Sequence, residues 1–418
     1  MASKKMNGLD QKETKKREKK KRIKMENENN VTCENLPAFL SSFVDTFVDF
    51  TVTDGLFLPN PLPQNALEMP PPMAAHYPSP DRLVAIGDLH GDLEKSRRAF
   101  RLAGLIDGAD RWTGGSTTVV QVGDVLDRGG EEIKILYLLE KLKREAEKNG
   151  GKVLTLNGNH EIMNVELDFR YATKTGLKEF ENWGFWYGAG NKMKSLCVGL
   201  KKPRDLFDGV PLVFKGVDEK YWNGIRCRIA ALRPSGPIAG RFLSKNVTVL
   251  VVGESVFVHG GLLKEHVEYG LQKINEEVRD WINGLSGRHA PGYCTGRDAV
   301  VWLRKFSDDS VKCDCSLLEH VLATIPGAKR MIMGHTIQDF GINDVCDGRA
   351  IRIDVGMSKG CGNGLPEVLE ILGDKELQVL PLNPLYQNKN KIYMDAYSSR
   401  GLALPKPGQG LTEVEVKV

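Results

Sequence analysis

The chain has 418 residues, of which 41% are hydrophobic and 27% are charged, and its formal net charge is +4. No apolar run approaches the roughly 18 residues needed to cross a bilayer, so the sequence predicts no membrane insertion. The charge is uneven: residues 1–24 hold eleven Lys or Arg and three acids, which leaves the remainder net negative by four. Nucleic acid is therefore not expected as a partner, except at this basic tail.

The first 81 residues are expected to lie outside the catalytic domain. Residues 1–32 are predicted to be a disordered basic tail, with a nuclear localisation signal or an RNA-binding arm as the alternative interpretation. Within 33–81, an amphipathic stretch precedes a proline-rich linker at 59–80. The apolar residues of that stretch recur at helical spacing and are expected to pack on the catalytic domain, with a partner-binding helix as the alternative: Leu40, Phe43, Val44, Phe47 and Val48.

Five short segments carry chemistry-bearing residues, and each follows a short apolar run that predicts a buried strand. Glycine then lets the chain turn at the carboxyl end of the strand. Polar side chains should therefore gather along one edge of a sheet, where α/β folds place their sites. The segments are GDLHG (87–91), GDVLDRG (123–129), GNHE (158–161), HGG (259–261) and GH (334–335).

The donor types in these segments suit hard and borderline divalent metals, which take carboxylate, imidazole and amide ligands. No cysteine lies among them, so they do not form a structural thiolate zinc site. Two neighbouring ions need a bridging ligand, and a carboxylate can bridge them; such a pair lowers the pKa of a shared water and clamps the oxygens of a phosphoryl group. The candidate ligands are Asp88, His90, Asp124, Asn159, His259 and His335.

Three further residues of the segments complete a phosphoester-cleaving site. Arg128 follows Asp124 closely and can offer a planar fork to phosphate. His160, next to Asn159, can give a proton to the leaving group. Asp127 could hold the His160 ring in the donating tautomer.

The predicted helices follow the motifs, as βαβ alternation requires. The first motif opens a helix with Leu93, Ser96, Phe100 and Ala103 inward, and the second opens one with Ile135, Leu138, Leu139 and Leu142 inward. Segment 165–245 is expected to be an insertion. The aromatic cluster near its start is interpreted as core, with a substrate groove as the alternative: Trp183, Phe185, Trp186 and Tyr187. Residues 385–418 are expected to be a flexible tail.

The eight cysteines are irregularly spaced and include no CxxC pair, so mostly free thiols in a reducing compartment are expected. Cys313 and Cys315 form a CxC pair that could join Cys294 or Cys346 in a redox switch or a secondary metal site. The favoured interpretation is a pair of ordinary surface thiols.

The five motifs, present together and in order, resemble those of the phosphoprotein phosphatases of the metal-dependent Ser/Thr class. The resemblance spans Arg82 to Leu372 and implies an α/β fold, a two-sheet sandwich flanked by helices with a di-metal site at the strand carboxyl ends. The implied catalytic domain is 82–384. Asp88, His90 and Asp124 would hold one metal, and Asp124, Asn159, His259 and His335 the other, with Asp124 bridging. His160 would be the general acid, oriented by Asp127, and Arg128 would bind phosphate.

Three features resemble one branch of that family, the Shewanella-like protein phosphatases. About a hundred residues separate GNHE from HGG, VVWLRKF (300–306) replaces the LWSDP-like segment, and IRIDVGMSKGCGN follows GH. The N-terminal block LPAFLSSFVDTFVDFTVTDGLFLP is most similar to the plant type 2 members. In this branch Arg304 is a second phosphate-ligand candidate; the alternative is a surface arginine on a loop.

The resemblance implies hydrolysis of phosphorylated proteins at Tyr or at Ser/Thr by a metal-bridging hydroxide. The alternative activity is hydrolysis of dinucleoside polyphosphates or other small phosphoesters. Two divalent ions are expected, manganese first and iron or zinc as alternatives, and a redox or regulatory protein partner is considered. A cytoplasmic location is expected; the alternatives are the nucleus, through the basic tail, and the mitochondrial intermembrane space.

Overall fold

The structure is a computed structural model that describes residues 36–59, 72–308 and 313–382. The predicted basic tail (1–32), most of the proline-rich linker and the predicted C-terminal tail (385–418) lie outside the described residues. None of the helices described is long and apolar enough to cross a membrane.

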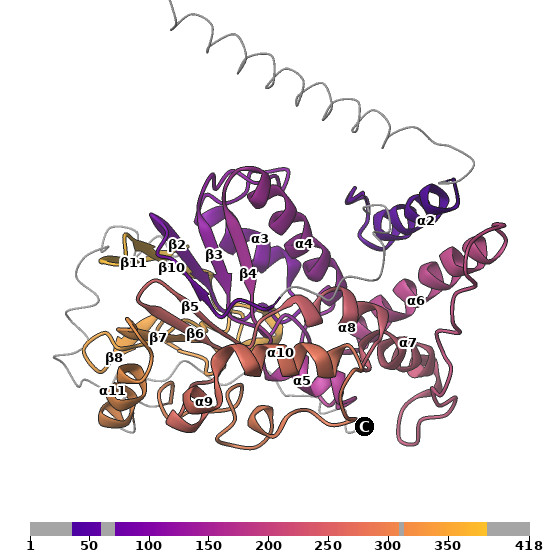
Figure 1. The fold of residues 1–418 in the computed structure, drawn as a ribbon. Helices are drawn as coiled ribbons and strands as arrows, with labels where there is room; N and C mark the ends of the chain where they lie inside the picture. Colours follow the sequence, from indigo (N-terminus) through magenta and orange to yellow (C-terminus); the bar gives the residue numbers. More distant parts are fainter. Residues whose placement is uncertain (1–35, 60–71, 309–312, 383–418) are drawn as a thin grey trace, which may run out of the picture.

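Two mixed β-sheets form the centre of the molecule (Figure 1). The five-stranded sheet has the order β11 (Glu376–Pro381), β10 (Glu367–Leu372), β2 (Arg82–Ile86), β3 (Thr118–Gln121) and β4 (Lys152–Thr155). The six-stranded sheet has the order β1 (His76–Tyr77), β5 (Val249–Val252), β6 (Ser255–Val258), β7 (Arg330–Met333), β9 (Ala350–Arg352) and β8 (Asn343–Val345). All five strands predicted before the motifs are confirmed, as β2, β3, β4, β6 and β7.

One apolar core lies between the two sheets because each sheet turns alternate side chains toward the other. Leu83 and Ala85 of β2 contribute from the first sheet, and Phe257 of β6 and Ile332 of β7 from the second. These residues are at most 1% exposed. The expected two-sheet sandwich is thus confirmed, and it brings the ends of β2, β3, β4, β6 and β7 close together.

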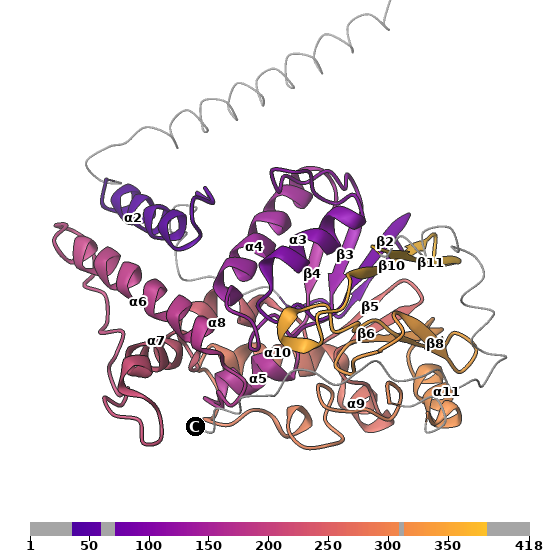
Figure 2. The ribbon, with the colours of Figure 1, turned by 180° about the vertical axis from the view of Figure 1, so that it is seen from behind.

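Helices cover the outer faces of both sheets (Figures 1 and 2). The helices that follow the first two motifs are α3 (Leu93–Leu102) and α4 (Glu132–Lys148). Their predicted inner residues are all buried. Between residue 82 and the end of the described chain, the other helices outside segment 165–245 are α5 (Asn159–Val165), α9 (Lys264–Tyr269), α10 (Leu271–Ile282) and α11 (Cys315–Ala323), with 3₁₀ turns η3 (Gly292–Cys294) and η5 (Lys359–Cys361).

The segment 165–245 is helical between β4 and β5. It contains α6 (Lys174–Ser195), η1 (Glu219–Tyr221), α7 (Trp222–Leu232), α8 (Pro237–Arg241) and η2 (Leu243–Lys245). Of its aromatic cluster, Trp183 is 1% exposed and belongs to the core as predicted, whereas Phe185 is 67% exposed. The core interpretation is therefore wrong for Phe185, which lies on the opposite side of α6.

The amphipathic stretch forms α2 (Leu36–Val52), which packs on α6. Val44 and Val48 are buried there, and a Cβ on Gly190 of α6 would lie 2.7 Å from Val48. Phe43, by contrast, is 69% exposed. Packing on the catalytic domain is thus confirmed, but the predicted face is wrong at Phe43, which lies outside the buried stripe of the helix.

Candidate metal centre and active site

The polar residues of the five motifs come together where the two sheets meet. Strands β2, β3 and β4 run parallel in one sheet, and β6 and β7 run parallel in the other. Each motif follows the carboxyl end of its strand, and GNHE continues into the first turn of α5. The backbone N–H groups of Leu89 and His90 both donate to the carbonyl of Asp124, at 3.0 and 2.9 Å, which locks the first two motifs together.

Asp124 occupies the centre of this cluster. Its Oδ2 atom lies 3.2 Å from Nε2 of His259, 3.5 Å from Nε2 of His90 and 3.8 Å from Nε2 of His160. Two groups of possible ligand atoms share it: His90, Asp124 and His160 form one, and Asp124, His259 and His335 the other. A carboxylate between two sets of imidazoles is what a bridging ligand requires.

Asp88 and Asn159, the remaining predicted ligands, border these groups. The oxygen Oδ1 of Asn159 lies 2.8 Å from Nε2 of His259. The carboxylate of Asp88 accepts the N–H of His335 at 3.1 Å. All six predicted ligands are buried and belong to one cluster.

Backbone hydrogen bonds aim the imidazole lone pairs inward. The Nδ1–H groups of His90 and His259 donate to the carbonyls of Leu126 and Val122, both at 2.9 Å. A carbonyl only accepts, so in the neutral rings Nε2 carries the lone pair. In His259 that lone pair faces the oxygens of Asn159 and Asp124. Converging lone pairs need a cation between them, so the donor set fits a metal ion.

Like charges accumulate in the same buried space. Burial, followed by the charges of Asp354 and Asp124, raises the pKa of Asp88 well above its usual range. Burial, with Asp124, raises the pKa of Asp354 to about 6. Burial also lowers the pKa of His90 to about 3, which keeps that ring neutral, as ligation requires. Divalent cations would relieve the repulsion among the three carboxylates.

Strained backbone marks the same residues. His90, Asp124, Asp127, Arg128 and His335 all have φ between +41° and +67°, the left-handed region that non-glycine residues rarely adopt. Such conformations persist where surrounding contacts impose them, and they concentrate at functional sites. The motifs thus place their side chains at a cost in backbone energy.

His160 and Asp127 form the expected pair. The Nδ1–H group of His160 donates to Oδ2 of Asp127 at 2.7 Å, and both side chains are at most 4% exposed. Burial alone would lower the pKa of His160, but Asp124 and the hydrogen bond to Asp127 outweigh it, so the pKa is raised. The Nε2 atom of His160 faces the cluster centre, 3.8 Å from Oδ2 of Asp124.

Arg128 lies at the rim beside Tyr171, an aromatic residue that the sequence had not singled out. The guanidinium is 4.9 Å from the ring centre of Tyr171, which is itself 5.0 Å from the His160 ring. Within the described part of the chain, the buried Nε of Arg128 has no hydrogen-bond partner. A donor in this state is suited to bind an anion.

Arg304 lies beside the predicted ligand His335. Its Nη1 donates to the carbonyl of His335 at 3.0 Å and to Oγ1 of Thr336 at 2.8 Å. The side chain is exposed, as the surface-arginine interpretation also expected. Both arginines therefore border the ligand cluster.

Sequence reasoning missed two buried acids that shape the site. Glu161, the last residue of GNHE, accepts the N–H groups of Asp124, Val125 and Leu126 at 2.8–3.0 Å and so braces the second motif. Its position directly after His160 in GNHE was the signal. Asp354 follows β9 and lies next to the carboxylates of the predicted ligands, but it belongs to none of the five motifs.

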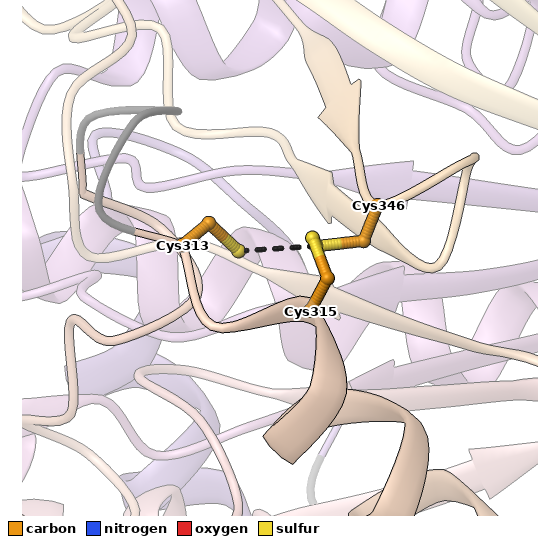
Figure 3. A group of neighbouring side chains, drawn as sticks. All are labelled: Cys313, Cys315 and Cys346. Carbon is orange, nitrogen blue, oxygen red and sulfur yellow. Dashed lines mark hydrogen bonds between the residues drawn. A yellow bond between two sulfur atoms is a disulfide. The ribbon is translucent and has the colours of Figure 1, made fainter.

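The CxC pair lies beside Cys346, the residue that follows β8 (Figure 3). Cys315 forms a disulfide with Cys346, and Sγ of Cys313 lies 3.3 Å from Sγ of Cys346. The favoured interpretation of ordinary surface thiols is therefore wrong, because the turn after β8 brings Cys346 to the start of α11. Of the two cysteines that could join the CxC pair, Cys294 and Cys346, it is Cys346 that does so. The five other described cysteines are free, as expected.

Comparisons with known proteins agree with this geometry. Residues 81–339 match the family model described as calcineurin-like phosphoesterase. The chain is 63% identical over 390 residues to Shewanella-like protein phosphatase 2 of Arabidopsis thaliana, covering 92% of this chain and 97% of the relative. Shewanella-like protein phosphatase 1 of Plasmodium berghei is 27% identical, covering 68% and 69% of the two chains.

A solved structure shares the fold at low sequence identity. A cold-active protein tyrosine phosphatase superposes with a TM-score of 0.53 at 18% identity, covering 73% of this chain and 78% of that one. The buried ligand cluster, the family match and the identity to the plant relative lead to one conclusion. The chain belongs to the calcineurin-like phosphoesterases and, within them, to the Shewanella-like protein phosphatases, which makes it a metal-dependent protein phosphatase.

Proposed function

We propose that Asp88, His90, Asp124, Asn159, His259 and His335 hold two divalent metal ions. The convergence of the Nε2 atoms of His90 and His259 on one oxygen of Asp124 supports the bridging role. Mixed imidazole, carboxylate and amide donors suit manganese, our first choice, and also iron or zinc. When bound, the ions would lower the pKa of a water molecule and stabilise negative charge on the phosphoryl oxygens.

His160 is the proton donor of this proposal, and its contact with Asp127 is the observation that carries the role. As a water oxygen forms its bond to phosphorus, the bond between phosphorus and the leaving oxygen breaks, and its electron pair stays on the leaving oxygen. The leaving oxygen then takes the proton from Nε2 of His160. Asp127 holds the opposite nitrogen, so that the ring keeps the donating orientation and the positive charge is stabilised beforehand.

Arg128 and Arg304 bind the phosphate group. Arg128 offers an unpartnered buried N–H, and Arg304 is anchored to the backbone of His335. Planar guanidinium groups match two phosphate oxygens at once, which fixes the orientation of the group for in-line displacement.

The substrate is a phosphorylated protein, and the phosphorylated residue is phosphotyrosine, phosphoserine or phosphothreonine. The bacterial protein of similar fold is described as a tyrosine phosphatase, and Tyr171 offers an aromatic face next to Arg128. A phosphopeptide panel assayed with manganese distinguishes these substrates. A dinucleoside polyphosphate in the same assay tests the alternative small-phosphoester activity, which the 63% identity to a protein phosphatase disfavours.

Replacing His160 by Asn tests the proton-donor role. Turnover of a phosphoserine peptide should fall by about 10²–10⁴-fold while bound metal, measured by mass spectrometry, is retained. Turnover of an aryl phosphate should fall much less, because a phenolate leaves more easily without a proton. Equal losses on both substrates would mean that His160 has a structural role only.

The cytoplasmic location and a redox or regulatory protein partner remain part of the proposal. The Cys315–Cys346 disulfide is the feature that makes the redox state of the compartment relevant. Fluorescence microscopy of the tagged chain tests the location, and a nuclear or mitochondrial signal would replace it.

A further inference from the structure

Arg228 of α7 is a fully buried cation next to the proposed acid pair. The side chain is 0% exposed, and all of its nitrogens make hydrogen bonds. Nη2 donates to Oδ1 of Asp127 at 2.8 Å and to Glu132 at 2.7 Å; Nη1 donates to Glu132 at 2.8 Å, and Nε to Oδ1 of Asn164 at 2.9 Å. A buried charge with this many partners has a defined position.

These contacts divide the two oxygens of Asp127 between two functions. Oδ1 accepts from Arg228, while Oδ2 accepts from Nδ1 of His160 at 2.7 Å and from Nδ2 of Asn164 at 2.9 Å. Asn164 is itself held by Arg228. The carboxylate therefore cannot rotate without breaking a bond to the guanidinium, and the direction of its hydrogen bond to His160 is fixed.

Charge balance depends on the same guanidinium. Glu132 accepts the backbone N–H of Asp127 at 2.8 Å, so two buried carboxylates adjoin each other. Burial would raise the pKa of Asp127, but the hydrogen bond from His160 and the charge of Arg228 outweigh it, and the pKa is lowered. Phe169 and Phe180 lie against the guanidinium, 5.6 and 4.6 Å from their ring centres. Buried between these rings, it provides the only cation that contacts Asp127 in the described residues besides His160.

The arginine comes from segment 165–245, in which the sequence analysis had named no catalytic or ligand residue. Helix α7 lies at the same end of the molecule as α5, which carries His160 and Asn164 (Figure 2). Residues 127 and 228 are 101 positions apart in the chain. Arg228 thus connects this segment to the proposed acid pair, in addition to the contact of Tyr171 with the His160 ring.

We propose that Arg228 is a positioning residue for proton donation: it holds the Asp127 carboxylate in the orientation that aims Nε2 of His160 at the leaving oxygen. This role rests on the proposed function of His160 as proton donor. Arg228 does not touch the substrate, so its effect passes through Asp127 and should change the rate of leaving-group departure rather than substrate binding.

Arg228→Lys tests the proposal, with Arg226→Lys as the matched control. Lysine keeps the charge but cannot serve all these acceptors with one ammonium group. Arg226 belongs to the same helix and stacks on Phe207, at 4.6 Å from the ring centre. In Arg228→Lys, kcat for a phosphoserine peptide should fall roughly 10–100-fold, with KM nearly unchanged and a much smaller loss on p-nitrophenyl phosphate. Arg226→Lys should retain its rates on both substrates.

A double-mutant cycle separates positioning from a general structural effect. In the His160→Asn background, Arg228→Lys should cause little further loss, because the group through which it acts is gone. Metal content and the melting temperature are measured for each variant. Should Arg228→Lys not fold, the pair Arg228→Met with Glu132→Gln removes one charge of each sign and leaves Asp127 without its cation. The same selective loss on the alkyl phosphate is expected.

The outcomes separate this inference from the proposed function. If His160→Asn shows no selective loss on alkyl phosphates, the proton-donor role itself fails. Two results would overturn the inference even if His160→Asn shows that loss. Arg228→Lys could lower kcat equally on both substrates, or it could lower kcat in the His160→Asn background by the same factor as in the wild type. Either result would make Arg228 a structural residue.

Discussion

Gly158 and Asp124 approach each other so closely that no other residue fits at position 158. A Cβ atom on Gly158 would lie 2.1 Å from Oδ1 of Asp124. That oxygen accepts the N–H of His160 at 3.0 Å. The glycine that opens GNHE therefore sets the position of the proposed bridging ligand, and its φ of −92° shows that space alone, not backbone freedom, requires glycine.

Gly158→Ala should consequently displace the Asp124 side chain. We expect bound metal and turnover to fall by at least about tenfold, because a ligand shifted by 1 Å no longer meets the required geometry. Gly108→Ala is the control, since a Cβ there meets no atom within 4 Å. Wild-type metal content in Gly158→Ala would contradict the bridging role of Asp124.

Asp124→Asn tests the bridging role by charge rather than by space. An amide carries no negative charge and bridges two cations poorly, so turnover of an aryl phosphate should be abolished and bound metal reduced. Asp107, whose carboxylate accepts the N–H groups of Ala109 and Arg111 in a surface loop, provides the Asp→Asn control. Full activity in Asp124→Asn would exclude the assignment.

Chelation should lower the thermal stability of the protein. The buried carboxylates of Asp88, Asp124 and Asp354 repel one another when no cation is bound. Metal at 100 times its Kd would add about 2.7 kcal/mol to the free energy of unfolding. Differential scanning fluorimetry with and without EDTA measures the shift. Asp124→Asn should respond less, and an equal response in that variant would place the stabilising metal elsewhere.

The disulfide should stabilise the fold without taking part in catalysis. Cys315–Cys346 closes a loop of 31 residues, so its loss should cost about 3–4 kcal/mol. Cys346→Ser is the informative variant, because Cys313 is close enough to Cys346 to replace Cys315. Denaturant unfolding under oxidising conditions measures the loss, with Cys197→Ser as the free-thiol control. Loss of turnover in folded, metal-loaded Cys346→Ser would give the cysteines a catalytic part.

Glu179 of α6 predicts a pH dependence of stability. Burial, followed by the charge of Glu132, raises the pKa of Glu179 to about 8. The folded state then keeps a proton that the unfolded state has released above about pH 4.5, so stability should fall as the pH rises toward 8. Each pH unit in that window removes up to about 1.4 kcal/mol. Glu179→Gln should flatten the dependence; an unchanged slope would assign it to another group.

Much of this protein could be inferred from short stretches of sequence. An apolar run of four or five residues predicts a strand without knowledge of its partner, and the candidate ligands were all chosen from the residues that follow β2, β3, β4, β6 and β7. The inner faces of α3 and α4 followed from a spacing of 3.6 residues. These features are local, because strand period, turn chemistry and helix period depend on neighbours within a few positions.

Only the tertiary structure decided which distant groups meet. Arg228 and Asp127 are 101 residues apart, and no pattern in the insertion distinguishes that arginine from Arg226 two positions earlier. The same holds for Asp354 among the ligand carboxylates and for the choice of Cys346 as the partner of Cys315. Burial of charges selects such partners: a carboxylate or guanidinium removed from water must find its counterpart wherever packing brings the chain together.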